Sequence, residues 1–135
     1  MKRLLFGSIV GLALAAASVS VAARGSNPAT IVLVPPGGGA VPTTIWPRLG
    51  DGVAFATTYP KQLDKYGVGV HLSCFQNGSL VYSETQPNTA TFTLGGTSSP
   101  WRTTGGPAYC VADLYYWNSQ GFNWLAGAQF TASGY

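Results

Sequence analysis

Residues 67–82 read GVGVHLSCFQNGSLVY, and this stretch decides the fold class. Apolar side chains alternate with small or polar ones over residues 68–74, which is the period-two pattern of a half-buried strand. Asn77 and Gly78 follow, and this pair is typical of a two-residue hairpin turn because both positions adopt positive φ. A second strand-like run begins at Ser79. The stretch therefore predicts an antiparallel β-hairpin.

Similar strand signals recur on both sides of this hairpin, between short segments rich in Gly, Pro and Asn. No window carries the apolar stripe of an amphipathic helix, and only residues 60–66 could hold one helical turn. The first strand-like run, residues 29–34, could also be a tail, because Pro35 and Pro36 close it. We therefore predict an all-β fold, an antiparallel β-sandwich of about seven strands at residues 29–34, 52–59, 67–76, 79–85, 90–94, 108–117 and 123–131.

Three segments resemble the immunoglobulin-like superfold. Residues 49–55 (LGDGVAF) resemble the G-D-x-V-x-F start of its second strand, and residues 72–82 resemble its third strand turning into the next edge strand. Residues 108–114 (AYCVADL) resemble its sixth strand with its cysteine. The resemblance covers residues 29–132. It is to small exported bacterial proteins with immunoglobulin-like or fibronectin-III-like domains, and it implies a β-sandwich without implying a particular activity.

Cys74 and Cys110 are the only cysteines, and an even number in an oxidising compartment predicts a disulfide. In the chain-entropy model, closing a loop of this length stabilises a fold by about 4 kcal/mol. The antibody-type domain has its first cysteine on the second strand, whereas Cys74 falls on the expected third strand. We therefore expect the disulfide to join neighbouring strands of one sheet. The alternative is that residues 67–76 form the second strand.

The N-terminus has the three parts of a secretory signal peptide. Lys2 and Arg3 precede an apolar run at residues 4–14, and a small-residue stretch ends in Ala22 and Ala23, after either of which cleavage is expected. The alternative is an uncleaved membrane anchor, since residues 4–23 are just long enough to span a bilayer. Ala and Ser near the end of that run suit a signal peptidase and make the run less hydrophobic. We therefore expect cleavage and not a stable membrane anchor.

We therefore expect a secreted or periplasmic protein with a signal peptide at residues 1–23. An N-terminal segment at residues 24–48, containing the expected first strand, would follow it. Residues 49–135 would form the remainder of a single domain.

The charge of the exported part argues against nucleic-acid binding. The whole chain has a formal charge of +3, but two of its seven cationic side chains belong to the predicted signal peptide. Five cations and four carboxylates remain: Arg24, Arg48, Lys61, Lys65, Arg102, Asp51, Asp64, Glu84 and Asp113. A nearly neutral domain has no basic stripe to contact phosphates.

One pair of side chains suggests acid–base chemistry. If the Asn77-Gly78 turn sets an uninterrupted register, His71 lies opposite Glu84 on the outer side of the hairpin. A histidine beside a carboxylate can serve as a general base. The alternative is an exposed cross-strand ion pair of little energetic weight. Because no nucleophile with a second base accompanies the pair, we assign no catalytic residue. The chain has a single histidine and no cluster of metal-ligating residues, so we expect no metal and no other cofactor.

Aromatic side chains give the strongest indication of function. Side chains alternate between the two faces of a strand, so on the strand that carries the inward-pointing Cys110 we expect three aromatic residues to point outward: Tyr109, Tyr115 and Trp117. Phe122 and Trp124 follow the next turn, and Tyr82 is expected on the same face two strands away. An exposed sheet face of this kind stacks on sugar rings or docks proteins. The alternative is that these rings are covered by residues 29–46 or form structural cross-strand pairs.

The leading hypothesis is a non-catalytic, exported immunoglobulin-like domain that binds a protein or cell-surface partner. A second hypothesis is a carbohydrate-binding module that uses Tyr115, Trp117 and Trp124. A third is a structural component of the cell envelope, and a hydrolase is the least expected. Coplanar exposed rings would favour a sugar ligand, whereas an apolar convex patch would favour a protein.

Overall fold

The computed structural model describes residues 19–21, 28–41, 45–97 and 99–134. The predicted signal peptide lies outside the described residues except for its segment at 19–21. The one-turn helix expected at residues 60–66 is the 3₁₀ helix η3. The elements of the described part are β1 (Val19–Val21), β2 (Thr30–Val34), η2 (Pro36–Gly38), β3 (Gly52–Thr58), η3 (Lys61–Tyr66), β4 (Gly69–Gln76), β5 (Ser79–Pro87), β6 (Phe92–Thr93), η4 (Thr103–Gly105), β7 (Ala108–Asn118) and β8 (Gly121–Ala132).

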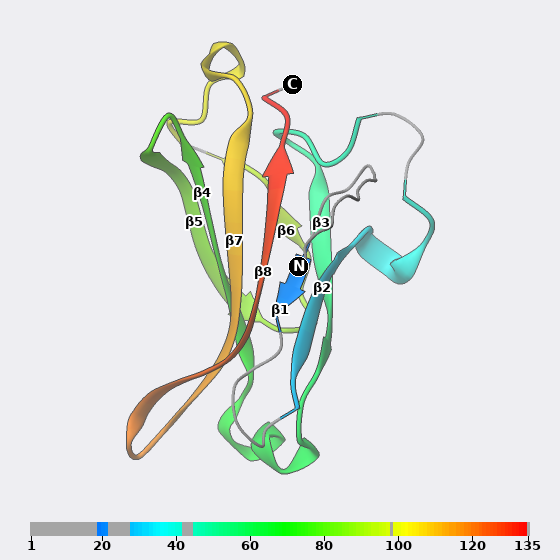
Figure 1. Cartoon of the computed structure of the whole chain (residues 1–135), viewed down its shortest axis with the longest axis vertical. Coiled ribbons are helices and arrows are strands. Elements are labelled where there is room, and N and C mark those ends of the chain that lie inside the picture. Colours follow the sequence, from blue (N-terminus) through cyan, green and yellow to red (C-terminus); the bar gives the residue numbers. More distant parts are fainter. Residues whose placement is uncertain (1–18, 22–27, 42–44, 98, 135) are drawn as a thin grey trace, which may run out of the picture.

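The strands form two antiparallel sheets packed face to face (Figure 1). The large sheet has the order β1-β8-β7-β4-β5, and the small sheet has the order β2-β3-β6. Each of the seven predicted strands has a counterpart, so the all-β sandwich is confirmed. The run at residues 29–34 is a strand and not a tail. β1, in the predicted signal peptide, was not expected.

The core lies between the two sheets because strands from both present alternating apolar side chains inward. Phe55 of the small sheet contacts Phe92 of its own sheet edge-on, with ring centroids 5.7 Å apart. It also reaches Phe130 of the large sheet, at 6.3 Å. Burying apolar surface in this way is the main stabilisation available to a domain of this size. The largest fully buried side chains are Ile31, Val53, Val70, Leu72, Phe92, Leu94, Leu114 and Leu125.

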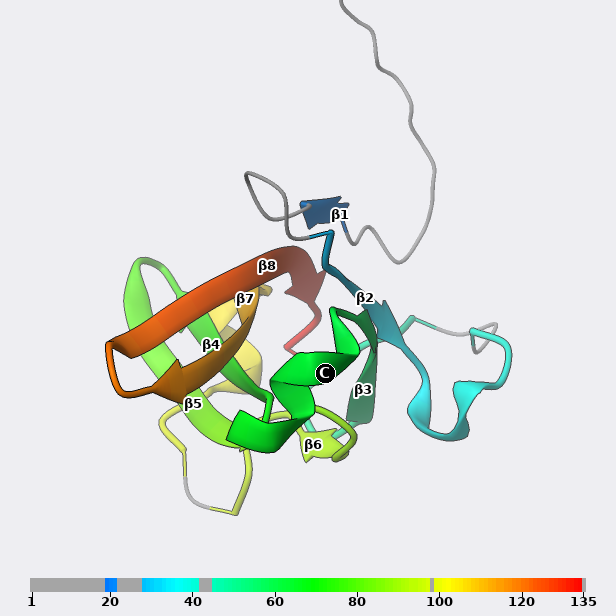
Figure 2. The ribbon, with the colours of Figure 1, turned by 90° about the horizontal axis from the view of Figure 1, so that it is seen from below.

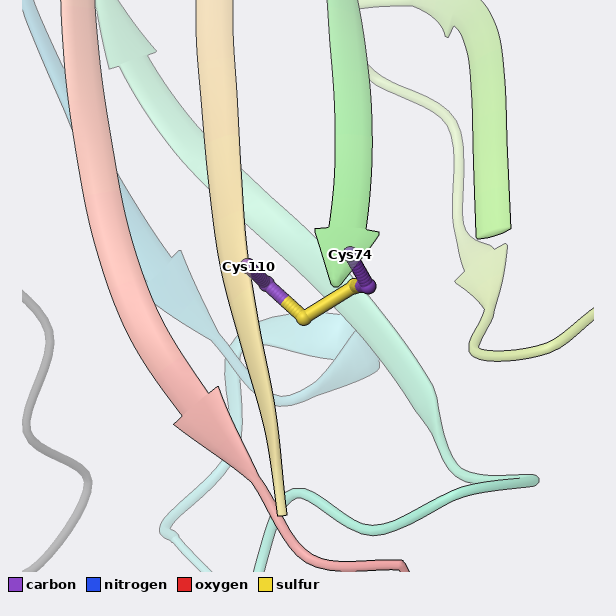
Figure 3. Close-up of a disulfide and its surroundings, with 2 residues drawn as sticks. All are labelled: Cys74 and Cys110. Atoms are coloured by element: carbon purple, nitrogen blue, oxygen red, sulfur yellow. A yellow bond between two sulfur atoms is a disulfide. The ribbon is translucent and has the colours of Figure 1, made fainter. Parts of the chain in front are cut away.

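The disulfide links the centre of the large sheet. Cys74 of β4 lies directly opposite Cys110 of β7, and both are completely buried (Figure 3). The predicted link between neighbouring strands of one sheet is therefore confirmed. Counted from β2, residues 69–76 form the third strand of the sandwich, so the alternative that placed them second is wrong.

The β4–β5 hairpin begins as predicted and then changes register. Asn77 and Gly78 have φ values of 51° and 81°, the positive angles of the expected turn. Phe75 lies opposite Leu80, as the turn predicts, but a β-bulge follows and Cys74 lies opposite Tyr82. Val81 is the extra residue, and the remaining partners along β5 shift by one position.

The shift makes the predicted His71–Glu84 pair wrong. His71 lies opposite Thr85, and Glu84 lies opposite the fully buried Leu72. Because side chains alternate between the faces of a sheet, moving the register by one residue transfers Glu84 to the inward side. Histidine and carboxylate therefore lie on opposite faces of the large sheet.

Gln76, at the end of β4, is a buried polar residue that holds the loop before β7. Its Nε2 donates to the carbonyl oxygens of Arg102 and Gly106 at 2.9 and 2.7 Å. Its Oε1 accepts a hydrogen bond from the Arg102 backbone N–H at 3.0 Å. A Cβ placed on Gly105 would lie 2.8 Å from the same Nε2, so this position needs glycine. One amide thereby satisfies three backbone groups of the loop.

Replacing both cysteines, Cys74→Ala with Cys110→Ala, should lower the free energy of unfolding by about 4 kcal/mol, because the unfolded chain loses its cross-link. Urea unfolding followed by fluorescence measures the change. Reduction of the unaltered protein should produce a comparable decrease. An unchanged unfolding midpoint in both experiments would contradict the prediction.

Gln76→Ala should lower the free energy of unfolding by about 2–4 kcal/mol, because three hydrogen bonds are lost and buried backbone groups lose their partners. The same urea measurement applies. Gln62→Ala, at an exposed position on η3, is the matched control and should change stability by less than about 0.5 kcal/mol. Equal effects of the two substitutions would argue against the proposed role of Gln76.

Candidate binding surface

The outer face of the large sheet, which points away from the small sheet, is ordered into rows by the strand register. Its two ends are apolar and aromatic, and a polar belt lies between them. From one end toward the other the rows are Leu80–Phe75–Tyr109–Thr131, Ser83–Ser73–Val111–Gln129, Thr85–His71–Asp113–Gly127 and Pro87–Gly69–Tyr115–Trp124. Trp117 and Phe122 form a further pair beyond the last row.

Four of the predicted aromatic residues come together at this last end, and we call them the aromatic patch: Tyr115, Trp117, Phe122 and Trp124. They lie near the turn between β7 and β8, where the hairpin extends away from the rest of the sandwich (Figure 1). Trp117, Phe122 and Trp124 are 58%, 52% and 39% exposed. Exposed rings this close together form an apolar surface of the kind that marks an interaction site.

Phe122 lies at the centre of the aromatic patch. Its ring stacks on Tyr115, with centroids 5.2 Å apart and planes inclined by 22°. Trp117 meets the same ring edge-on, at 5.9 Å and 74°. Both geometries are favourable for aromatic pairs, so the rings restrict one another's movement. The patch is therefore partly ordered by its own ring contacts.

Two glycines in neighbouring rows make room for the rings. A Cβ on Gly69 would lie 3.2 Å from Tyr115 Oη and 3.3 Å from its Cε1. A Cβ on Gly127 would lie 3.3 Å from Trp124 Cζ2. Tyr115 thus lies over a glycine of the adjoining strand β4, whereas Trp124 lies over a glycine of its own strand, three residues further along β8. Each ring covers backbone that has no side chain of its own. This packing holds both rings against the sheet.

A hydrogen bond fixes the orientation of Trp124. Its indole Nε1 donates to Asp113 Oδ1 at 3.0 Å. Asp113 lies on the outer face of the large sheet, in the row next to Trp124. An ionised acceptor strengthens such a bond. The carboxylate therefore acts as an anchor at the boundary between the polar belt and the aromatic patch.

The opposite side of the same hairpin is supported by η3. Tyr116 of β7 stacks on Tyr66, with ring centroids 5.3 Å apart and planes inclined by 22°. Lys65 Nζ lies 5.2 Å from the centroid of the Tyr66 ring, which is within cation–π range. The extended end of the hairpin is thus held on one side by η3 while its other side carries the patch. Neither Tyr66 nor Tyr116 carries a sequence pattern that predicts this contact.

Tyr109 and Tyr82 do not belong to the patch. Tyr109 is on the predicted face and is 47% exposed, but it lies six residues from Tyr115 along β7, about 20 Å away at the rise of a strand. Tyr82 was expected on the outer face and is instead 6% exposed and part of the core. Its ring packs against Trp101, with centroids 6.5 Å apart. The bulge at Val81 is the physical reason, because it turns Tyr82 inward.

His71 lies in the polar belt among hydroxyl groups. Its Nδ1 is 2.6 Å from Thr85 Oγ1, and its Nε2 is 3.0 Å from Ser73 Oγ. Ser83 Oγ lies 3.4 Å from the same Nε2. In a serine–histidine–aspartate triad, a carboxylate on Nδ1 orients the imidazole and stabilises its charged form. Here the Thr85 hydroxyl occupies that position, so the arrangement of Ser73 and His71 differs from that of the triad.

Glu84 faces an open groove of about 620 Å³ beside the edge strand β5. Tyr82 Oη donates to Glu84 Oε1 at 2.5 Å, and Gln86 Nε2 donates to Oε2 at 3.0 Å. Burial and then the bond to Glu84 raise the pKa of the Tyr82 hydroxyl. The sequence gives no signal for this groove, because its position depends on the bulge. With both oxygens engaged, Glu84 serves here to hold two neighbouring side chains in place.

Asp113→Ala should remove the acceptor of the Trp124 indole while leaving the rest of the patch in place. The indole N–H resonance of Trp124 should then exchange faster with solvent, and stability should fall by about 1 kcal/mol. NMR of the four indole N–H groups measures the effect, with Trp117 as the internal control. Unchanged exchange at Trp124 would contradict the assigned bond.

Within the described ranges, no group of three or more His, Cys, Asp or Glu side chains is placed to hold a metal ion. Among the same residues, no helix is both long and apolar enough to cross a membrane. No protein-family model, curated protein or solved structure matches this chain.

Proposed function

We propose that the protein is an exported, non-catalytic immunoglobulin-like domain that binds a protein partner through the aromatic patch. The observation that carries the proposal is the position of Trp117 and Phe122. Both rings are more than half exposed, and they lie where the β7–β8 hairpin extends beyond the sandwich (Figure 1). Trp and Tyr are enriched among the residues that dominate binding energy at protein interfaces.

The geometry of the rings favours a protein over a sugar. A sugar-binding platform needs ring faces that lie in one plane and remain open. Trp117 is inclined by 74° to Phe122, and Tyr115 and Phe122 lie face to face with each other. The result is a surface of rings inclined at different angles, which suits the side chains of a protein. A carbohydrate ligand stays the second hypothesis, because Trp117 and Trp124 are both exposed.

Order in the free state also supports a binding role. Tyr115 lies over Gly69, and Trp124 is held over Gly127 by its bond to Asp113. Side chains that are already fixed lose less conformational entropy on association, so more of the contact energy contributes to affinity. The two glycines therefore contribute to binding without touching the partner.

Export is supported by two independent features. The N-terminus has the charged, apolar and small-residue parts of a secretory signal. Cys74 and Cys110 form a disulfide, and structural disulfides form and persist in oxidising compartments. A partner would accordingly be met in the periplasm, at a cell surface or in the medium.

Site-specific photo-crosslinking tests the proposal. A photo-reactive phenylalanine analogue at position 117 should link the exported protein to a defined partner, because this position is at the exposed end of the hairpin. The same analogue at position 109 is the matched control, since Tyr109 is also an exposed aromatic residue on the same face. Mass spectrometry identifies the linked protein. Equal crosslinking from both positions, or none from position 117, would refute the proposed site.

Once crosslinking has identified the partner, Trp117→Ala combined with Phe122→Ala should weaken its binding to this protein at least about tenfold, as expected for central aromatic contacts. Tyr109→Ala should change the affinity less than about threefold, because it lies outside the patch. Titration calorimetry measures both. A glycan array tests the second hypothesis. Binding to a glycan that is lost in Trp117→Ala would show that the ligand of the patch is a sugar and not a protein.

A further inference from the structure

β8 has a partner strand on its outer edge that export would remove. The backbone of β1 pairs antiparallel with β8, and the paired residues are Val19 with Gln129, Ser20 with Ala128 and Val21 with Gly127. Figure 2 shows β1 beside β8 and above β2. Both predicted cleavage positions, after Ala22 and after Ala23, lie beyond β1 in the sequence. Cleavage at either position therefore leaves residues 127–129 of β8 without this partner.

The uncovered edge lacks the features by which proteins discourage strand pairing. Natural edge strands carry charged side chains or proline, or are covered by other segments. From Gly121 to Ala132 the sequence contains no charged residue and no proline. The end beyond the strand is covered, because the Ser133 N–H donates to the Pro47 carbonyl at 3.0 Å and the Leu49 N–H donates to the Ser133 carbonyl at 2.8 Å. Among the described residues, β1 is the strand that pairs with the outer edge of residues 127–129.

We propose that, after export, residues 127–129 of β8 dock an extended, uncharged segment of another chain, which adds as a strand to the large sheet in the place of β1. The proposal depends on the predicted cleavage and is independent of the aromatic patch. Backbone hydrogen bonds would supply the affinity, as in other cases of strand addition. Small and β-branched residues like the Val-Ser-Val sequence of β1 match the strand that the site already accepts.

The surroundings of the site favour a single strand over a second folded copy. β2, from the small sheet, lies close to both β1 and β8. A strand that pairs with residues 127–129 therefore also lies beside β2, as the single extended segment β1 does (Figure 2). Joining two copies through their β8 edges would require two whole sandwiches to approach at this position. The occupant is accordingly an unpaired segment of a partner protein.

The test uses the exported protein as it is processed by the cell. Intact mass should place the new N-terminus at Ala23 or Arg24, and a start at or before Val19 would overturn the proposal because β1 would remain. A synthetic peptide of residues 18–23, SVSVAA, is then added at millimolar concentration. Hydrogen exchange of the edge-facing amides within residues 127–129 should slow at least about tenfold, because they gain carbonyl partners.

A peptide carrying both Val19→Pro and Ser20→Pro is the matched control, since successive residues of a strand direct their N–H groups to opposite sides and proline cannot donate to the ladder. It should leave exchange unchanged. Equal protection by both peptides, or protection by neither, would overturn the proposal. So would a concentration-dependent dimer in which the same amides are already protected without peptide. Trp117→Ala should not alter peptide protection, so this test and the crosslinking test can fail separately.

Discussion

The antiparallel pairing of β4 with β7 is the constraint on which the rest of the structure depends. Cys74 and Cys110 lie opposite each other in this pairing, and their bond prevents the two strands from slipping. A slip of one residue would exchange the inner and outer faces of the sheet. The same register that buries Leu72 and Leu114 also places Gly69 opposite Tyr115. The disulfide thus fixes the core and, at the other end of the two strands, the floor of the aromatic patch.

Most of the fold could be predicted because its determinants are local. Period-two alternation identified the strands, and the Asn77-Gly78 turn gave the first pairs of the hairpin correctly. The prediction failed at Val81, where one extra residue shifted every later pair and separated His71 from Glu84. Val81 and Tyr82 are consecutive residues with similar apolar character, so either could have been taken as the inward one. A bulge is decided by packing across the sandwich, which a single strand sequence does not record.

The positions of the aromatic residues were predicted in part. The alternation of side chains along the strand correctly placed Tyr115 and Trp117 on the same outer face. The short turn then brings Phe122 and Trp124 opposite them. The roles of Gly69 and Gly127 were missed, because glycine in a strand normally indicates only weak strand propensity. The signal that could have revealed Gly69 is its pairing with Tyr115, since an aromatic residue facing a glycine on the next strand has space to lie flat. That signal becomes visible only after the register between distant segments is known.

The aromatic patch comes entirely from one short, contiguous piece of chain around the β7–β8 turn. The disulfide, the hydrogen bonds of Gln76 to the loop before β7 and the inter-sheet core all lie outside that piece. Substitutions near the turn can therefore alter ligand preference while the scaffold keeps its fold. In evolutionary terms, the tip of the hairpin is free to diversify at a different rate from the body. Homologues of this domain would then be expected to share a framework while recognising unrelated targets.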